Sequence, residues 1–290
     1  MTVLEAIQRT SEFLTRKGVD SPRLQAELLL ASVLKLPRMQ LYLNFERPLA
    51  ESELGTFREQ VRRRAAREPL QQILGSTSFC GFEIAVSRHV LTPRPETEQL
   101  AEHAWQWVEA RFGGKDGVHT ECACLDYGTG SGCLAIAVAA KCARARFHAL
   151  DISAEALELA QTNAVQNGVQ DRITFIRSAG LEALPEDARF HLLVSNPPYI
   201  PTQEIPTLQP EVKDFEPLQA LDGGADGLDF YRMFAAQGAR VLHPGGKIML
   251  EFGDGQADAI QSLFEKEKWI VDAIHRDYTQ RPRILVGTCR

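Results

Sequence analysis

The sequence predicts an α/β protein in which a doubly wound parallel sheet, with helices on both faces, follows a small helical domain and a linking β-hairpin. Apolar residues keep helical spacing over about the first 70 positions. Short β-type runs then occur between Thr77 and Thr92, and strands alternate with helices beyond them. We therefore divide the 290 residues into a helical domain (1–74), a hairpin linker (75–92) and a sheet domain (93–290).

The helical domain contains three predicted helices. The first carries apolar residues at helical spacing from Leu4 to Leu14. The second has Ser21 as its N-cap and Pro22 at its first position, and its apolar face at residues 24–33 ends before Pro37. The third extends from Glu51 to Arg67. The third helix carries a basic run made of Arg62, Arg63, Arg64 and Arg67. Such a run is either a solvated helix face or a docking surface for an acidic or RNA-bound partner, and the sequence leaves both open.

The sheet domain begins with the motif Pro-Arg-Pro-Glu-Thr-Glu at residues 93–98, which leads into a helix to about Phe112 and a polar loop at 113–119. A helix is expected to end near Leu242, with Pro-Gly-Gly at 244–246 separating it from an apolar strand at 248–252. The other predicted strands are residues 123–126, 146–151, 173–177, 190–195, 269–273 and 283–287, and the helices between them cover 133–141 and 154–167.

Composition narrows the functional classes. A formal net charge of −6 disfavours sequence-independent binding of nucleic acid, which basic proteins gain from counterion release. No run of about 18 apolar residues and no leader pattern occurs, so we expect a cytoplasmic protein without membrane association. The six cysteines and seven histidines show no spacing typical of metal sites, so no metal is predicted.

A glycine-rich turn follows the first predicted strand of the sheet, at the crevice where doubly wound sheets bind ligands. Asp151 ends the second strand, where an acidic side chain can accept hydrogen bonds from ribose hydroxyls. The spacing of G-x-G-x-x-G is not met and no lysine closes the loop, so a nicotinamide dinucleotide is only a minor alternative and a P-loop is excluded. The predicted cofactor loop consists of Gly128, Thr129, Gly130, Ser131 and Gly132.

The sequence Asn-Pro-Pro-Tyr at 196–199 follows a buried apolar strand and faces the same crevice. Two prolines make this turn rigid, and it presents oxygen acceptors. The side-chain oxygen of Asn196 and the carbonyl of Pro197 can each accept one N–H of a planar NH₂ group, while the ring of Tyr199 packs on it. These bonds strengthen as the nitrogen becomes cationic during methylation. The pattern therefore indicates a methyltransferase acting on an amide or amine nitrogen, with S-adenosyl-L-methionine as cofactor and S-adenosyl-L-homocysteine as product.

These motifs resemble those of the peptide chain release factor N(5)-glutamine methyltransferases, the PrmC/HemK family, over nearly the whole chain. The resemblance implies a Rossmann-like class I methyltransferase fold and a helical substrate-docking domain. It also implies that the substrate is the glutamine of the Gly-Gly-Gln motif in class I release factors. The residues carried over as substrate contacts are Arg94, Glu96, Asn196, Pro197, Pro198 and Tyr199, and Asn196 also adjoins the cofactor.

Two positions depart from the family pattern. Residues 178–181 lack the acidic residue that can hold the adenine amino group, so backbone atoms around Gly180 are expected to replace it. Near the C-terminus, Thr279 and Gln280 stand where a glycine is expected.

The sequence leaves two other functions open. One is an adenine-N(6) methyltransferase acting on DNA or RNA, because the same turn serves an exocyclic base amine. The other is a non-catalytic cofactor-binding fold, for which an intact Asn196 and Tyr199 have no use.

Overall fold

A computed structural model describes residues 1–113 and 121–290. The chain forms two compact units, and each is described by itself. The first comprises residues 1–76 together with 209–215, and the second comprises 77–208 with 216–290. Most of the polar loop predicted at 113–119 lies outside the described residues. Within the described ranges, no helix has the length and apolar character needed to cross a membrane.

The first unit is a helical bundle whose core collects the apolar faces of its helices. Its first helix starts at a capping box, in which the Thr2 side chain accepts from the Glu5 amide and Glu5 accepts from the Thr2 amide. A short helix between the second and third predicted helices was not expected. The helices are α1 (Val3–Arg16), α2 (Pro22–Leu34), α3 (Arg38–Leu41), α4 (Glu51–Ala65), α5 (Leu70–Leu74) and α9 (Pro210–Lys213).

The predicted hairpin, β1 (Ser76–Phe79) and β2 (Phe82–Ala85), forms a separate two-stranded sheet, and all of it except Ser76 belongs to the second unit. A seven-stranded sheet follows, in the order β5-β4-β3-β6-β7-β9-β8. Its strands are β3 (Cys122–Tyr127), β4 (Ala145–Asp151), β5 (Ile173–Arg177), β6 (Phe190–Ser195), β7 (Leu242–Glu251), β8 (Ile270–Arg276) and β9 (Pro282–Thr288).

Five neighbouring strands are parallel, as the alternation of strands and helices predicts. In sheet order they are β5, β4, β3, β6 and β7. Strand β9 pairs antiparallel with both β7 and β8, so the sheet is mixed at this edge. A hairpin connects β8 directly to β9, and consecutive strands joined by such a short turn must be antiparallel.

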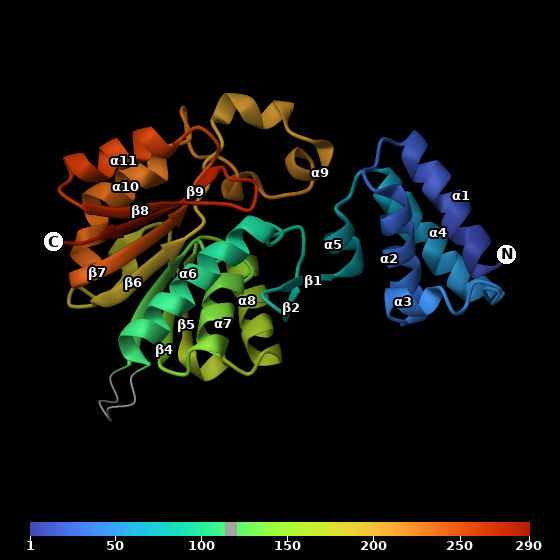
Figure 1. Cartoon of the computed structure of the whole chain (residues 1–290), viewed down its shortest axis with the longest axis horizontal. Coiled ribbons are helices and arrows are strands. Elements are labelled where there is room, and N and C mark those ends of the chain that lie inside the picture. The colour runs from blue at the N-terminus through green and yellow to red at the C-terminus, as the bar shows by residue number, and fades with distance from the viewer. Residues whose placement is uncertain (114–120) are drawn as a thin grey trace. The chain divides into compact units, whose positions relative to one another are not determined.

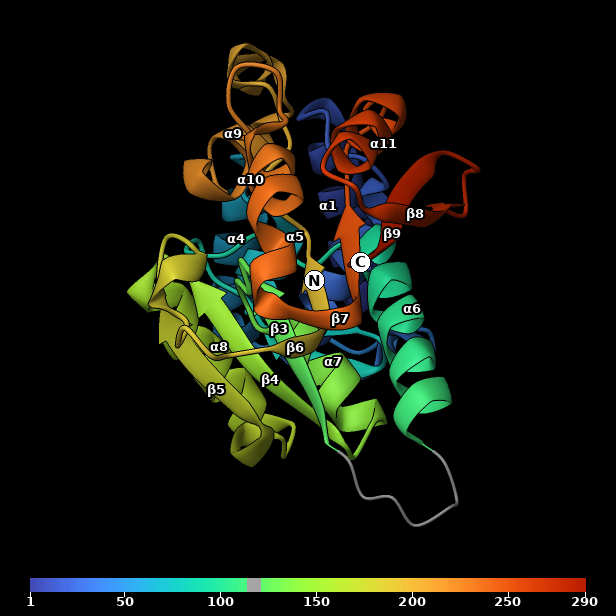
Figure 2. The same cartoon turned by 90° about the vertical axis from the view of Figure 1, so that its left-hand side faces the viewer.

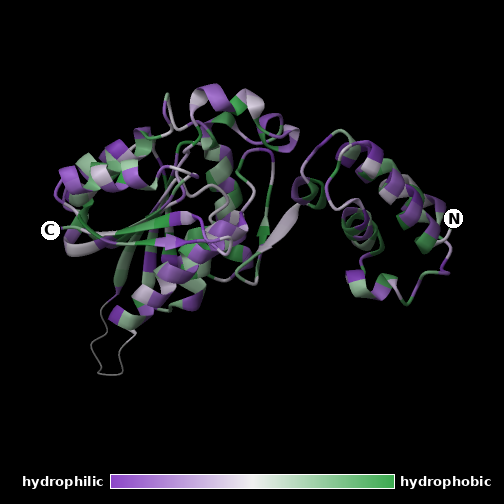
Figure 3. Cartoon of the chain, turned by 45° about the horizontal axis from the view of Figure 1, so that its top comes forward, coloured by the Kyte–Doolittle hydropathy of each residue, from purple (hydrophilic) through white to green (hydrophobic). Residues whose placement is uncertain are grey.

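Helices cover both faces of this sheet (Figures 1 and 2). On one face lie α6 (Pro95–Phe112), α7 (Cys133–Lys141) and α8 (Ala154–Gln166), and on the other lie α10 (Asp229–Gln237) and α11 (Ala257–Lys266). The two faces have separate apolar cores. Figure 3 shows the hydrophobic colour following the strands between the more hydrophilic outer helix surfaces. This arrangement places the carboxyl ends of the parallel strands at one edge.

The region around Pro-Gly-Gly differs from the prediction. The α-helix α10 ends at Gln237, and a 3₁₀ helix at Gly238–Val241 carries helical structure up to Leu242, as predicted. Strand β7, however, runs through residues 244–246 instead of starting after them. The pairing with β6 shifts from Phe190↔Leu242 to Leu192↔Lys247, which is a bulge. Because a bulge leaves residues out of the ladder, it accommodates a proline without interrupting the strand.

Candidate active site

Three loops converge where the central parallel strands end. The register pairs Tyr127 of β3 with Leu150 of β4, and Asp126 of β3 with Val194 of β6. Since these partners lie at the carboxyl ends of their strands, the glycine loop, Asp151 and the Asn-Pro-Pro-Tyr turn become neighbours. This is the edge at which doubly wound sheets bind ligands.

The loop between β3 and α7 is tied to the carboxylate of Asp151. The Gly130 amide donates to one carboxylate oxygen at 2.8 Å, and the Ser153 amide donates to the other at 2.9 Å. Burial raises the pKa of Asp151, while these backbone donors lower it. Each oxygen keeps a further lone pair, so the side chain can still accept from a ligand.

Asp126 also holds this loop in place. The sequence alone did not indicate this role for Asp126. One carboxylate oxygen accepts from the Thr129 hydroxyl at 2.7 Å and from the Ala135 amide at 3.3 Å. The other oxygen is buried and has no hydrogen-bond partner in the described part of the chain. Burial raises the pKa of Asp126 to about 7.

A cavity of about 790 Å³ opens between these loops, within the size range of cofactor sites. Among the predicted residues, those that line it are Gly128, Thr129, Gly130, Ser131, Asp151, Arg94, Asn196 and Pro198. Other predicted residues, all in the described ranges, are not part of its lining: Gly132, Gly180, Pro197, Tyr199 and Glu96.

Two of these positions have structural explanations. Gly132 precedes α7 with φ +81°, and a Cβ there would lie 3.1 Å from both Ala160 and Ile136, so helix packing requires the glycine. Beside Gly180, the cavity is lined by Ser178 and Ala179 instead. The Ala179 carbonyl accepts from the Tyr127 hydroxyl at 2.7 Å, which fixes this wall of the cavity.

The Asn-Pro-Pro-Tyr turn is held by backbone contacts on its far side. Gln256 donates to the Tyr199 carbonyl at 2.9 Å, and Ile200 exchanges hydrogen bonds with Leu221 and Gly223. A Cβ on Gly227 would lie 2.3 Å from the Tyr199 carbonyl oxygen. The turn therefore sits against a close-packed backbone surface, which adds to the rigidity that the two prolines give it.

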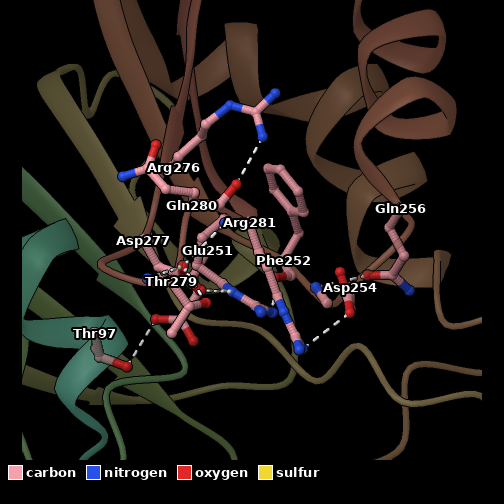
Figure 4. Close-up of polar contacts among 12 residues, drawn as sticks. Thr97, Glu251, Phe252, Asp254, Gln256, Arg276, Asp277, Thr279, Gln280 and Arg281 are labelled. Atoms are coloured by element: carbon pink, nitrogen blue, oxygen red, sulfur yellow. Dashed lines mark hydrogen bonds and ion pairs between the residues drawn. The ribbon is translucent and has the colours of Figure 1, made fainter.

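In the side-chain amide of Asn196, the nitrogen and the oxygen differ in their hydrogen bonding. Its Nδ2 donates to Oγ1 of Thr97 at 3.0 Å, whereas its Oδ1 is buried and has no partner within the described ranges. Thr97 in turn donates to Oε2 of Glu251 at 2.7 Å, which Figure 4 shows as α6 meeting the end of β7. Burial raises the pKa of Glu251 to about 7. Thr97 lies inside the predicted 93–98 motif, but Glu251 has no local sequence pattern that marks it.

Arg94 and Glu216 connect two loops at the mouth of the cavity. One guanidinium nitrogen of Arg94 donates to both carboxylate oxygens of Glu216, and the Thr92 amide donates to one of them at 3.3 Å. Arg94 lines the cavity together with Pro217 and Leu218, which follow Glu216. The pair therefore holds the chain before α6 against the segment after the Asn-Pro-Pro-Tyr turn.

The arginine run in the first unit is not an unpaired cationic surface. Arg62 pairs with Glu59 and Arg63 pairs with Glu68, while Arg64 and Arg67 both bind Glu211. The Arg64 side chain is buried, so it does not belong to a solvated face. These contacts also explain why residues 209–215 belong to the helical unit.

Comparison with known proteins agrees with this geometry. The PrmC N-terminal domain matches residues 5–75, and the methyltransferase small domain matches residues 117–208. A release factor glutamine methyltransferase from Geobacter sulfurreducens is 43% identical, covering 91% of this chain and 89% of the relative. The enzyme of the same name from Chlorobaculum tepidum is 44% identical, covering 89% and 87%. The chain belongs to the release factor glutamine methyltransferase family. It is therefore a methyltransferase, and the family resemblance inferred from its motifs is confirmed.

A solved structure supports the fold of this family member. The catalytic domain of hMettl16, in complex with a hairpin of the MAT2A 3′UTR, superposes with a TM-score of 0.56 and covers 80% of this chain and 81% of that one. At 16% identity this similarity concerns the fold alone. The Rossmann-like class I methyltransferase sheet is thus confirmed.

Proposed function

We propose that this enzyme transfers the methyl group of S-adenosyl-L-methionine to the side-chain amide nitrogen of the glutamine in the Gly-Gly-Gln motif of class I release factors. The observation that carries the proposal is the buried, unpartnered Oδ1 of Asn196 beside the cavity. A buried acceptor without a partner is costly and calls for an N–H donor. A planar amide NH₂ supplies that donor.

The residues of the cavity fit the cofactor. Residues 128–131 place loop backbone before the N-terminus of α7, where free N–H groups favour the methionyl carboxylate. Asp151, with one lone pair left on each oxygen, would accept from the ribose hydroxyls. Ser178 and Ala179 stand where we expect the adenine, in place of Gly180.

The protein's contribution to the reaction is positioning and charge stabilisation. When bound, the cofactor supplies an electrophilic methyl on a sulfonium, which the amide nitrogen attacks as the carbon–sulfur bond breaks. Asn196 Oδ1 and the Pro197 carbonyl would accept the two N–H groups and stabilise the growing positive charge. The nitrogen then loses its surplus proton to water. The Tyr199 ring packs against the apolar core beneath the turn, and we assign this residue to supporting the turn.

Transfer of labelled methyl from the cofactor tests this function. The acceptors are a purified class I release factor, its variant with the Gly-Gly-Gln glutamine changed to alanine, and a DNA duplex. We expect label on the wild-type factor alone. Label on DNA, or equal label on both forms of the factor, would contradict the proposed substrate.

A further inference from the structure

We propose that Thr97 and Glu251 are positioning residues that hold the Asn196 side chain with its carbonyl oxygen toward the substrate. This inference rests on the proposed function, because only an N–H substrate needs an acceptor at that place. Both side chains are almost fully buried, and Thr97 lines the cavity beside Asn196 whereas Glu251 does not. Glu251 therefore acts on the site through Thr97 and Asn196. The Thr97 hydroxyl, whose hydrogen is given to Glu251, acts by accepting from Asn196.

The orientation of an asparagine amide follows from what its neighbours can donate or accept. An ionised carboxylate only accepts hydrogen bonds, and a threonine hydroxyl has one hydrogen to give. Since Thr97 gives that hydrogen to Glu251 at 2.7 Å, its oxygen must accept from Asn196, 3.0 Å away. This forces Nδ2 toward Thr97 and leaves Oδ1 as the group available to the substrate.

Protonation of Glu251 removes this constraint. A neutral carboxyl group can donate to Thr97, which can then donate to Asn196 Oδ1 and turn the amide around. The substrate would meet an NH₂ group in place of an acceptor, and two donors cannot pair. The charge on Glu251 thus selects the productive amide orientation.

The surroundings of Glu251 place the pKa of its carboxyl group near neutral pH. Burial raises its pKa to about 7, and the nearby Glu96 raises it as well, while Arg283 and Arg94 lower it. Tyr231 donates to the backbone carbonyl of Glu251 at 2.7 Å and does not satisfy its carboxylate. Burial, and after it the Glu251 carboxylate, raises the pKa of the Tyr199 phenol to about 12. We expect kcat to fall as the pH drops through about 7, with cofactor affinity unchanged.

The matched variants are Thr97→Val, which keeps the shape and removes the hydroxyl, and Thr97→Ser, which keeps the hydroxyl. Glu251→Gln removes the charge. We expect Thr97→Val and Glu251→Gln to lower kcat by about 10- to 100-fold and to lose the pH dependence, with Thr97→Ser restoring most of both. Thr162→Val is the control, because the exposed Thr162 donates its hydroxyl hydrogen to the Glu158 carbonyl of its own helix.

A second measurement does not depend on the substrate. The chain has only four asparagines, so ¹⁵N labelling of asparagine side chains gives few amide signals, and Asn196→Asp identifies the one of interest. In wild-type protein the Asn196 signal should titrate with Glu251, and in Thr97→Val and Glu251→Gln it should shift and stop titrating. The other three signals report whether each variant is folded.

The two measurements separate the outcomes. An Asn196 signal that is the same in wild type, Thr97→Val and Glu251→Gln would overturn the positioning role, whatever the substrate. Wild-type rates in folded Thr97→Val would also overturn it while leaving the proposed function intact. If the wild-type enzyme fails to methylate the release factor but the Asn196 signal titrates as expected, the proposed function fails and the positioning role stands.

Discussion

Arg94 and Glu216 form a two-oxygen ion pair, with one guanidinium nitrogen of Arg94 at 2.8 and 2.7 Å from the carboxylate oxygens of Glu216. Glu216 is buried, with 1% of its side chain exposed, whereas Arg94 is 37% exposed. Burial raises the pKa of Glu216, and Arg94 opposes that shift. The pair therefore compensates a buried charge at the mouth of the cavity.

Replacing Arg94 by methionine should destabilise the protein by about 1–3 kcal/mol, because it leaves the buried Glu216 without its cation. The partial exposure of Arg94 keeps this below the cost of breaking a fully buried pair. Chemical denaturation of Arg94→Met, Glu216→Leu and the double variant tests the pair. If the double variant is less stable than Arg94→Met, the unpaired charge is not the cause of the loss.

Changing Asp151 to alanine should weaken cofactor binding by about 1.5–3 kcal/mol, the usual range for hydrogen bonds to a charged acceptor. Asp151→Asn keeps an acceptor for the Gly130 amide but lacks the charge, so its loss should be smaller. Calorimetric titration with S-adenosyl-L-homocysteine measures both. Unchanged affinity in Asp151→Ala would refute the assignment of this residue to the ribose.

Asp126 should make stability depend on pH. Its pKa is raised from 3.8 to about 7 by burial, so the folded state binds more protons than the unfolded state between these values. The contribution of this group to stability is therefore greatest below pH 3.8. It falls by about 1.4 kcal/mol per pH unit as the pH rises from 3.8 to about 7, and it is constant above that. Asp126→Asn keeps the acceptor for Thr129 and should flatten the slope. Free energies of unfolding with the same pH slope in both proteins would argue against a raised pKa.

Gly227 and Gly255 offer a matched pair of substitutions, since their φ angles are +75° and +77°. Alanine at Gly255 meets open space and should cost only the conformational strain, about 1–2 kcal/mol. Alanine at Gly227 adds a clash with the Tyr199 carbonyl and should displace the Asn-Pro-Pro-Tyr turn. We expect Gly227→Ala to lose more stability, and to lose activity that Gly255→Ala retains. Equal effects in thermal unfolding and in methyl transfer would show that the contact is unimportant.

The parts of the fold and of the candidate site that could be predicted from the sequence are those that local residue patterns determine. The glycine loop, Asp151 and the Asn-Pro-Pro-Tyr turn lie at the ends of strands whose apolar runs are clear, and the structure brings them to one edge of the sheet. The contact between Thr97 and Glu251 could not be predicted, because 154 residues separate them and nothing near Glu251 marks a partner. In the same way, nothing near Glu211 indicates that it binds Arg64 and Arg67.

The turn between β8 and β9 departs from the family pattern in a way that the sequence alone could not explain. A glycine is expected near Gln280, and the structure explains why, since Gln280 has φ +66° in the left-handed region. The turn is held by the buried Asp277, which accepts from the Thr279 amide and hydroxyl (Figure 4). These side-chain contacts compensate for a backbone conformation that glycine would adopt without strain.

The most direct test of the central claim is the single-turnover rate of methyl transfer by Asn196→Ala, with saturating cofactor and a wild-type release factor. If Asn196 accepts an N–H of the substrate glutamine, the barrier should rise by about 2–4 kcal/mol while the affinity for S-adenosyl-L-homocysteine changes little. A wild-type rate, or a loss explained entirely by weaker cofactor binding, would contradict the account.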